Sequence, residues 1–264
     1  MTDIVLDSVC VTRDGRNVLD NVTTQFGSNE LVALLGANGA GKSTLIRSGL
    51  GLIPVQQGTA HIDGQDSNRI NPADRARKVA YLPQSRSLSW PLNVLDTIAL
   101  GRYAYGVRLG RLSSTDNDAV QRAVRACDLE HLVHRRVDQL SGGELARVHC
   151  ARAFAGEAPM LLADEPVAEL DPLHQFQLMQ LIRDYVDDDN GAVVIMHDPE
   201  LAARFADRLV WMVGGKIVAD GTVMGTLTSE QLASVYGMRA DVFWRDKEAQ
   251  VTMIGPVSHA NEKS

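Results

Sequence analysis

The 264-residue sequence contains no run of about 18 apolar residues free of charge, the length that a helix needs to cross a bilayer. Its first residues, Met1 to Ile4, also lack the basic segment and apolar run that mark a secretory signal. Basic residues are in the minority, with 26 Lys and Arg against 33 Asp and Glu, so the net charge is -7 at pH 7. Nucleic-acid-binding proteins usually carry a basic surface instead. We therefore expect a soluble cytoplasmic protein that binds no nucleic acid.

Cysteine is scarce as well, with three residues in the whole chain. Cys10, Cys127 and Cys150 lie far apart and share no metal-binding spacing, so we expect buried free thiols in a reducing compartment. No internal repeat and no heptad run is visible. What is present is an ordinary hydrophobic content of 45%, enough for one large domain or two small ones with a buried core.

Short apolar runs alternate with helical segments along most of the chain. Residues 31–35 (LVALL), 160–163 (MLLA) and 192–196 (AVVIM) are continuous apolar runs, typical of strands that are buried on both faces. Between about Leu92 and Ala155 such runs are absent, and apolar residues recur at helical spacing instead. This order predicts an α/β fold that has a parallel sheet and an inserted helical subdomain.

The most specific local motif follows the apolar run at residues 31–35. It fits G-x-x-x-x-G-K-[ST] and stands between a predicted strand and a predicted helix, as a phosphate-binding P-loop requires. Glycines let backbone N–H groups approach phosphate oxygens, and the helix N-terminus adds partial positive charge. We expect Lys42 to bind the β- and γ-phosphates of ATP and the hydroxyl of Ser43 to bind Mg²⁺. The predicted nucleotide-binding residues of this loop are Gly36, Ala37, Asn38, Gly39, Ala40, Gly41, Lys42, Ser43 and Thr44.

Two adjacent carboxylates, Asp164 and Glu165, follow the apolar run at residues 160–163. The carboxyl end of a parallel strand is the edge of the sheet where α/β proteins bind their ligands. Adjacent carboxylates are unfavourable there unless a cation is near, so we expect Asp164 to hold Mg²⁺, directly or through water. We predict that Glu165 is the base that polarises the attacking water.

A second glycine-rich motif, LSGGE, occupies residues 140–144 and precedes a predicted helix. Ser141 suits the N-cap position, and Glu144 three residues later completes a capping box. The exposed N–H groups around Ser141, Gly142 and Gly143 then form an anion-binding site. This site lies too far along the chain to serve the phosphates that the P-loop holds.

The P-loop, LSGGE and the segment MLLADEP at residues 160–166 together resemble the ATP-binding cassette (ABC) ATPases, over about residues 4–240. The resemblance implies that LSGGE binds the ATP of a second subunit, so that two copies form a head-to-tail homodimer with ATP at the interface. It implies that Gln84 contacts Mg²⁺ and the attacking water, that His197 contacts the γ-phosphate, and that Asp171 crosses the dimer interface. The expected catalytic residues are thus Glu165, His197 and Gln84, and the expected metal ligands are Ser43, Gln84 and Asp164.

The same resemblance implies the architecture of a P-loop NTPase (RecA-like) core with an antiparallel β subdomain and a helical subdomain at about residues 85–155. We accordingly expect one ABC ATP-binding domain over residues 1–240 and a C-terminal tail over 241–264, which frays after about Val251. The implied partners are transmembrane permease subunits and, indirectly, a substrate-binding protein, with the ATPase placed peripherally on the cytoplasmic face of the membrane. Trp90 stands where the family docks its permease, and packing inside the helical subdomain explains this residue equally well.

Within the family, three features are similar to the ATPases of importers for iron-siderophore, haem and cobalamin. Residues 99–103 (ALGRY) resemble a stretch after the Q-loop, residues 170–175 (LDPLHQ) resemble a D-loop continuation, and the length is that of a single cassette. The implied function is ATP hydrolysis that powers uptake of a metal chelate. The alternatives are the ATPase of an exporter or lipid transporter and a soluble ABC protein of DNA repair or translation. LSGGE, Gln84 and His197 speak against a small-molecule kinase, and no residue identifies the cargo.

The sequence departs from the family pattern at four positions. Arg13 stands where members often carry an aromatic residue that stacks on adenine, although a guanidinium also stacks on planar rings. Glu144 replaces the commoner glutamine of the signature, and Ala168 and Glu169 replace the usual serine and small residue before Asp171. These changes bear on how adenine is held and on how the two ATP sites are coupled.

Overall fold

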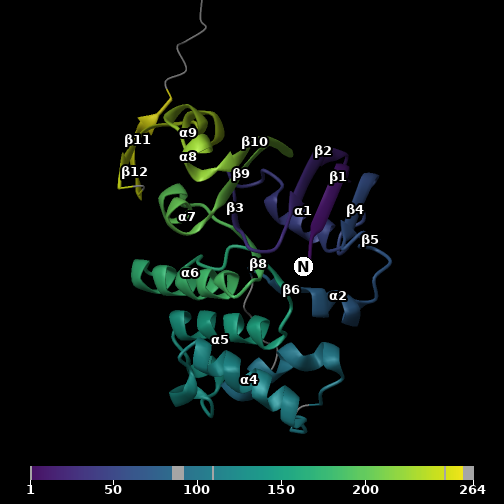
Figure 1. Ribbon diagram of the computed structural model, residues 1–264. Coiled ribbons are helices and arrows are strands. Elements are labelled where there is room, and N and C mark those ends of the chain that lie inside the picture. The colour runs from purple at the N-terminus through teal and green to yellow at the C-terminus, as the bar shows by residue number, and fades with distance from the viewer. Residues whose placement is uncertain (1, 85–91, 109, 247, 258–264) are drawn as a thin grey trace, which may run out of the picture.

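The computed structural model describes residues 2–84, 92–108, 110–246 and 248–257. Within these residues a six-stranded sheet crosses the centre of the molecule, in the order β10-β9-β3-β8-β7-β6 (Figure 1). Neighbouring strands from β9 to β6 run parallel, and β10 pairs antiparallel with β9, so the predicted parallel sheet is confirmed. The strands are β3 (Leu31–Gly36), β6 (Val79–Leu82), β7 (Met160–Ala163), β8 (Gly191–Ile195), β9 (Arg208–Val213) and β10 (Lys216–Thr222).

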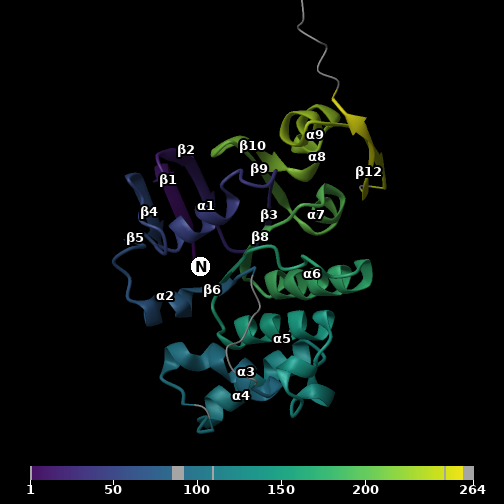
Figure 2. The ribbon, with the colours of Figure 1, turned by 180° about the vertical axis from the view of Figure 1, so that it is seen from behind.

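A second sheet lies beside the first and contains, among the described residues, four strands in the order β2-β1-β4-β5. They are β1 (Ile4–Arg13), β2 (Arg16–Phe26), β4 (Gln57–Ile62) and β5 (Gln65–Asp66), and every pair is antiparallel. Figure 2 shows helix α1 (Lys42–Gly49) between this sheet and the central one, and helix α2 (Pro72–Lys78) leading into β6. The antiparallel β subdomain that the family resemblance implied is therefore present.

The segment from residue 92 to 155 contains helices and turns and no extended strand where it is described. Its elements are α3 (Val94–Ala99), the 3-10 helix η1 (Leu100–Tyr105), α4 (Ser114–Ala126), the 3-10 turns η2 (Glu130–Leu132) and η3 (Val137–Gln139), and α5 (Gly142–Ala155). In Figure 1 they lie below the sheet, beside helix α6 (Pro172–Asp187). The subdomain limits at 85 and 155 stay a prediction, and Trp90 lies outside the described residues.

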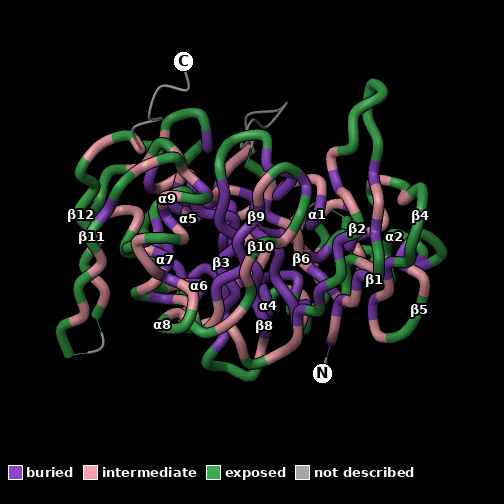
Figure 3. Tube along the Cα trace, turned by 90° about the horizontal axis from the view of Figure 1, so that it is seen from above, coloured by how far each residue is buried: buried purple, intermediate pink, exposed green. Residues whose placement is uncertain are grey.

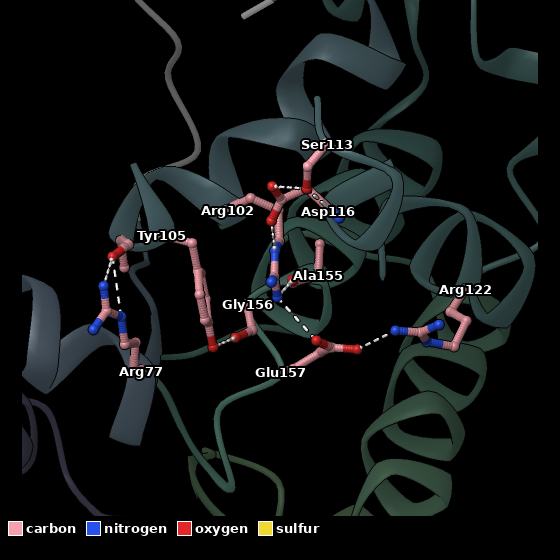
Figure 4. Close-up of polar contacts among 10 residues, drawn as sticks. Arg77, Arg102, Tyr105, Ser113, Asp116, Arg122, Ala155, Gly156 and Glu157 are labelled. Carbon is pink, nitrogen blue, oxygen red and sulfur yellow. Dashed lines mark hydrogen bonds and ion pairs between the residues drawn. The ribbon is translucent and has the colours of Figure 1, made fainter. Parts of the chain in front are cut away.

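A buried arginine joins η1 to the C-terminal end of α5 (Figure 4). Arg102 Nε lies 3.0 Å from Asp116 Oδ1, and its Nη1 lies 2.9 Å from Glu157 Oε2 and 3.1 Å from the carbonyl oxygen of Ala155. The ring of Tyr105 covers the guanidinium, whose carbon is 3.7 Å from the ring centroid. The arginine of the ALGRY stretch thus holds the helix whose N-terminus carries LSGGE.

The chain ends, as far as it is described, in a subdomain built on the far end of the sheet. It contains helices α7 (Pro199–Phe205), α8 (Val223–Thr226) and α9 (Ser229–Tyr236), and the hairpin β11 (Met238–Arg245) and β12 (Glu248–Pro256). The prediction of fraying after Val251 is wrong as far as Pro256, because β12 pairs with β11 there and Val251 N–H donates to Glu200 Oε2 at 2.9 Å. The proposed domain limit at residue 240 falls inside β11.

Each side of the central sheet has its own apolar core, and β3 supplies both. Leu31, Ala33 and Leu35 pack into the cluster that includes α5, α6, α7 and α9, whereas Val32 and Leu34 pack into the cluster under α1 and the antiparallel sheet. All five side chains are fully buried, as the continuous apolar run predicted. Figure 3 shows this buried interior around β3, β8 and β9. No helix among the described residues is long and apolar enough to cross a membrane.

Candidate active site

The P-loop is a tight turn between the end of β3 at Gly36 and the start of α1 at Lys42. Gly41, the last residue before α1, has φ 101°, a left-handed value that glycine adopts without strain. A Cβ at Gly41 would also lie 2.6 Å from the carbonyl oxygen of Val18. The loop residues Ala37, Asn38 and Gly39 are exposed, while Ala40 and Gly41 are buried and Thr44 is half-buried in the first turn of α1. Strand, turn and helix therefore follow one another as the motif predicted.

Lys42 lies across the loop that precedes it. Its side chain is buried, and Nζ donates to the carbonyl oxygens of Gly36 at 2.6 Å and Ala37 at 3.1 Å. Burial lowers the pKa of Lys42, and the nearby carboxylates Glu165 and Asp164 act in the opposite direction. The ammonium group is thus held at the mouth of the loop, beside the two acidic residues.

Asp164 follows β7 directly and its side chain is fully buried. It accepts hydrogen bonds from Ser43 Oγ at 2.8 Å, from Arg47 Nη2 at 2.9 Å and from Tyr81 Oη at 3.2 Å. Ser43 and Asp164, which are distant in sequence, are therefore in direct contact. Sequence reasoning did not identify Arg47 or Tyr81, although Arg47 follows Ser43 by one helical turn and so faces the same side of α1.

Glu165 is held between the two residues that family resemblance had assigned to hydrolysis. Gln84 Nε2 donates to Glu165 Oε2 at 2.7 Å, and His197 Nε2 lies 2.8 Å from Glu165 Oε1. The backbone of Glu165 has φ 53°, in the left-handed region that residues other than glycine seldom adopt. Strain of this kind is concentrated at functional sites, where the surrounding contacts hold it in place.

A cavity of about 740 Å³ opens above these residues. Its walls include six residues that the sequence had singled out and one that it had not, Tyr236 of α9. The lining residues are Ala37, Asn38, Gly39, Gln84, Glu165, His197 and Tyr236. The cavity therefore joins the exposed part of the P-loop to the carboxylate of Glu165, while Lys42, Ser43 and Asp164 are close by through the contacts described above.

The side chains in this region offer the kind of ligand atom that one metal ion, Mg²⁺, prefers. The Ser43 hydroxyl, the Asp164 carboxylate and the Gln84 amide offer oxygen atoms, which hard cations such as Mg²⁺ prefer. In the described parts of the chain no group of three or more His, Cys, Asp or Glu side chains is arranged so that it could hold a metal ion by itself. The residue set thus fits an ion that is shared between protein and phosphate oxygens rather than a closed protein site.

LSGGE forms the predicted capping box at the start of α5. The Ser141 hydroxyl accepts from Glu144 N–H at 3.3 Å, and Ser141 N–H donates to Glu144 Oε2 at 2.7 Å, a bond that lowers the pKa of Glu144. Ser141 and Gly142 are exposed, Gly143 is buried, and none of the three lines the cavity at the P-loop. The structure thus separates this predicted anion site from the other site residues.

Asp171 is likewise apart from the cavity. It caps α6, accepting from His174 N–H at 3.0 Å and lying 2.8 Å from His174 Nδ1. The start of α6 approaches the start of α5 so closely that a Cβ at Gly143 would lie 2.1 Å from the His174 ring. Arg13 ends β1, and its exposed side chain lies 3.9 Å from Asp14.

The chain is similar to known proteins of one family. The family model described as ABC transporter matches residues 19–168. The hemin import ATP-binding protein HmuV of Nocardia farcinica is 40% identical to this chain over 221 residues, which are 84% of this chain and 76% of that protein.

Solved structures share the fold. An ATP-binding cassette of an ABC transporter in its ADP conformation has a TM-score of 0.80 at 20% identity, covering 89% of this chain and 98% of the other. A dimeric bacterial ABC transporter cassette has a TM-score of 0.73 at 27% identity, covering 83% of this chain and 98% of the other. The P-loop core, the antiparallel sheet and the helical segment therefore occur together in proteins of one architecture.

Proposed function

Because this chain belongs to the ABC transporter family and is an ATPase subunit of an importer, we propose that it hydrolyses ATP to power the uptake of haem through a separate membrane permease. The observation that supports this cargo is the long match to a relative named for hemin import. Iron-siderophore and cobalamin, the other cargoes that the ALGRY and LDPLHQ segments favour, are the competing results of the test.

In the proposed reaction the P-loop binds the phosphates of ATP. Lys42 Nζ exchanges the carbonyl oxygens of Gly36 and Ala37 for β- and γ-phosphate oxygens, so its hydrogen bonds are kept when the ligand binds. Glu165 polarises the attacking water as general base, oriented by Gln84 on one carboxylate oxygen and His197 on the other. The orientation matters because a base must point at the water within hydrogen-bond reach.

Ser43, Asp164 and Gln84 would hold Mg²⁺, which neutralises negative charge on the phosphates when bound. The direct bond between Ser43 Oγ and Asp164 already brings two of these donors together. Arg47 and Tyr81 hold the other oxygen of Asp164, and therefore fix the direction of its carboxylate.

We assign the working unit to a head-to-tail homodimer with ATP at the interface. The capped N-terminus of α5 exposes Ser141 and Gly142 to solvent, away from the cavity of its own chain. A helix N-terminus with exposed N–H groups is suited to bind phosphate. Two copies related by a two-fold axis would each present this terminus, with Asp171 nearby, to the P-loop of the other.

The proposed location is the cytoplasmic face of the membrane, where ATP is available, with the subunit bound peripherally to the permease. A substrate-binding protein would deliver haem on the opposite side. The helical segment at residues 92–155 carries LSGGE on α5 and would transmit closure of the dimer to the permease.

The first experiment identifies the partner. A tagged Glu165→Gln variant, purified with ATP and Mg²⁺ from detergent-solubilised native membranes, should retain a polytopic permease because its hydrolysis is slowed by about 10²–10⁴-fold. Near-normal turnover of this variant would refute the role of Glu165. Absence of any membrane partner would favour a soluble cassette protein.

The second experiment determines direction and cargo. The complex is reconstituted into vesicles with the ATPase subunit on the outer surface and protein-bound haem in the lumen. An importer moves haem out into the medium when ATP and Mg²⁺ are added, and the Glu165→Gln complex does not. Movement into the lumen would establish export, and transport of cobalamin or a ferric siderophore in place of haem would reassign the cargo.

A further inference from the structure

His197 stands between the end of strand β8 and the start of helix α7. On the strand side, Met196 N–H donates to the carbonyl oxygen of Leu34 at 3.2 Å and ties the chain to the central sheet. On the helix side, the Asp198 carboxylate caps α7 and accepts from the backbone N–H of Glu200 at 2.9 Å. The direction in which the His197 side chain points therefore depends on where the first turn of α7 lies.

Helix α7 has seven residues, and a helix of about two turns is not stable by its own hydrogen bonds. Its inner face is fixed by three residues that are buried in the core, Pro199, Ala202 and Phe205. Its outer face borders a cavity of about 390 Å³ that lies between α6, α7 and β12, so packing on that side is incomplete. The position of the outer face therefore depends on polar contacts.

The C-terminal hairpin supplies such contacts, because β12 runs beside α7 (Figure 1). Glu200 Oε2, in the first turn of α7, accepts from Val251 N–H in β12 at 2.9 Å. Arg204 Nη2, one turn later, lies 3.4 Å from Glu248 Oε2 at the start of β12. β12 is held in turn by its antiparallel pairing with β11, in which Val251 pairs with Val242. Glu200 thus connects an ordered strand to the helical turn that follows His197.

We propose that Glu200 is a positioning residue for ATP hydrolysis. Through its bond to β12 it holds the first turn of α7, and so it keeps His197 Nε2 at 2.8 Å from Glu165 Oε1. Glu200 does not line the active-site cavity, so it acts through His197 and touches no substrate. The inference rests on the role proposed above for His197, and it gives the C-terminal hairpin a part in hydrolysis that the family motifs do not assign.

The test compares Glu200→Ala, which removes the acceptor, with Glu200→Gln, whose amide oxygen still accepts from the same N–H. ATP turnover of the permease complex is measured as phosphate release over a range of ATP concentrations. Glu200→Ala should lower kcat about threefold, because an exposed hydrogen bond lies at the low end of the usual range, and should leave KM for ATP unchanged. Glu200→Gln should restore most of kcat.

A spectroscopic readout separates positioning from general destabilisation. In the full chain with isotope-labelled histidine, the ring signals of His197 are identified by their absence from His197→Ala. Glu200→Ala should shift these signals, and Glu200→Gln should keep them. Thr23→Ala is the matched control, because Thr23 Oγ1 also accepts from a strand N–H, that of Ser8 at 2.9 Å, and lines no part of the cavity. The control should keep the wild-type signals and kcat even where its Tm falls.

The inference is overturned if Glu200→Ala keeps the wild-type kcat or leaves the His197 signals unshifted. It is also overturned if Glu200→Gln loses as much activity as Glu200→Ala, because the hydrogen bond would then not be the cause, or if Thr23→Ala loses as much. Full turnover by His197→Ala would instead overturn the role proposed for His197 itself.

Discussion

Replacing the buried Arg102 should destabilise the protein far more than replacing Arg122, an exposed arginine that also contacts the Glu157 carboxylate. Arg102→Met keeps most of the side-chain volume and removes the charge. It leaves Asp116, whose side chain is 13% exposed, without its cation, while Ser113 still donates to that carboxylate. Glu157 keeps a second partner, Arg122, and is 42% exposed.

The size of the effect follows from this burial. Removing one partner of a buried ion pair costs about 3–5 kcal/mol, because it leaves a charge buried without compensation. The lower end, about 3 kcal/mol, applies here because Glu157 retains solvent and Arg122. For a chain of this size that corresponds to a fall in Tm of roughly 6–12 °C. Arg122→Met removes a pair whose arginine is 56% exposed and screened by solvent, so it should change Tm little.

The effect of pH provides an independent check. Hydrogen bonding from Ser113 and the charge of Arg102 hold the pKa of Asp116 below its usual 3.8. A carboxylate whose pKa is lowered on folding contributes stability above its unfolded pKa, and this contribution is lost as pH falls through the folded pKa. The difference between wild type and Arg102→Met should therefore be complete at pH 7 and shrink below about pH 3.8.

Thermal unfolding followed by circular dichroism, at pH 7 and at a series of lower pH values, measures these differences. The reasoning would be refuted if Arg102→Met and Arg122→Met lowered Tm equally. It would also fail if the difference from wild type grew as the solution was acidified, because protonation of Asp116 removes the uncompensated charge.

Three further predictions concern Gly101, the LSGGE serine and the P-loop lysine. Gly101→Ala should lower the free energy of unfolding by about 1–3 kcal/mol in urea titrations, because its Cβ would lie 2.1 Å from the Arg152 carbonyl oxygen. The control is Gly27→Ala, whose added Cβ would meet no atom within 4 Å. Ser141→Ala should cost about 1 kcal/mol and weaken ATP-dependent dimerisation measured by light scattering, and a threonine there should restore most of both. Lys42→Ala should weaken ATP binding by more than about tenfold in calorimetry, and unchanged affinity would contradict its contact with phosphate.

Features whose geometry is set by residues close together along the chain could be predicted from the sequence. The apolar run before Gly36 and the glycines up to Gly41 fix a strand, a turn and a helix within a few residues of one another. The capping box of Ser141 and Glu144 is equally local, since both of its hydrogen bonds join residues three apart. The adenine contact was left open at Arg13, and the structure places that side chain in solvent.

The prediction of a fraying end failed as far as Pro256, because the β11–β12 hairpin depends on contacts with the rest of the protein. β12 has no buried residue, and its pairing with β11 is reinforced by Glu200 and Arg204 of α7, which are distant in sequence. The sequence pattern gives no distance between α7 and β12, which are far apart along the chain. It therefore could not predict that β12 is ordered.

The sequence by itself determined the chemistry of this protein: a P-loop, a carboxylate pair after a buried strand and a capped LSGGE helix, each specified by residues adjacent along the chain. Only the tertiary structure decided which distant groups meet that chemistry. Gln84 and His197 reach Glu165, Arg47 and Tyr81 reach Asp164, and Tyr236 reaches the cavity, because the parallel strands β3, β6, β7 and β8 end at one edge of the sheet and α9 packs beside it. Local motifs are encoded by short-range geometry, whereas these contacts depend on how separate elements bury their apolar faces against one another.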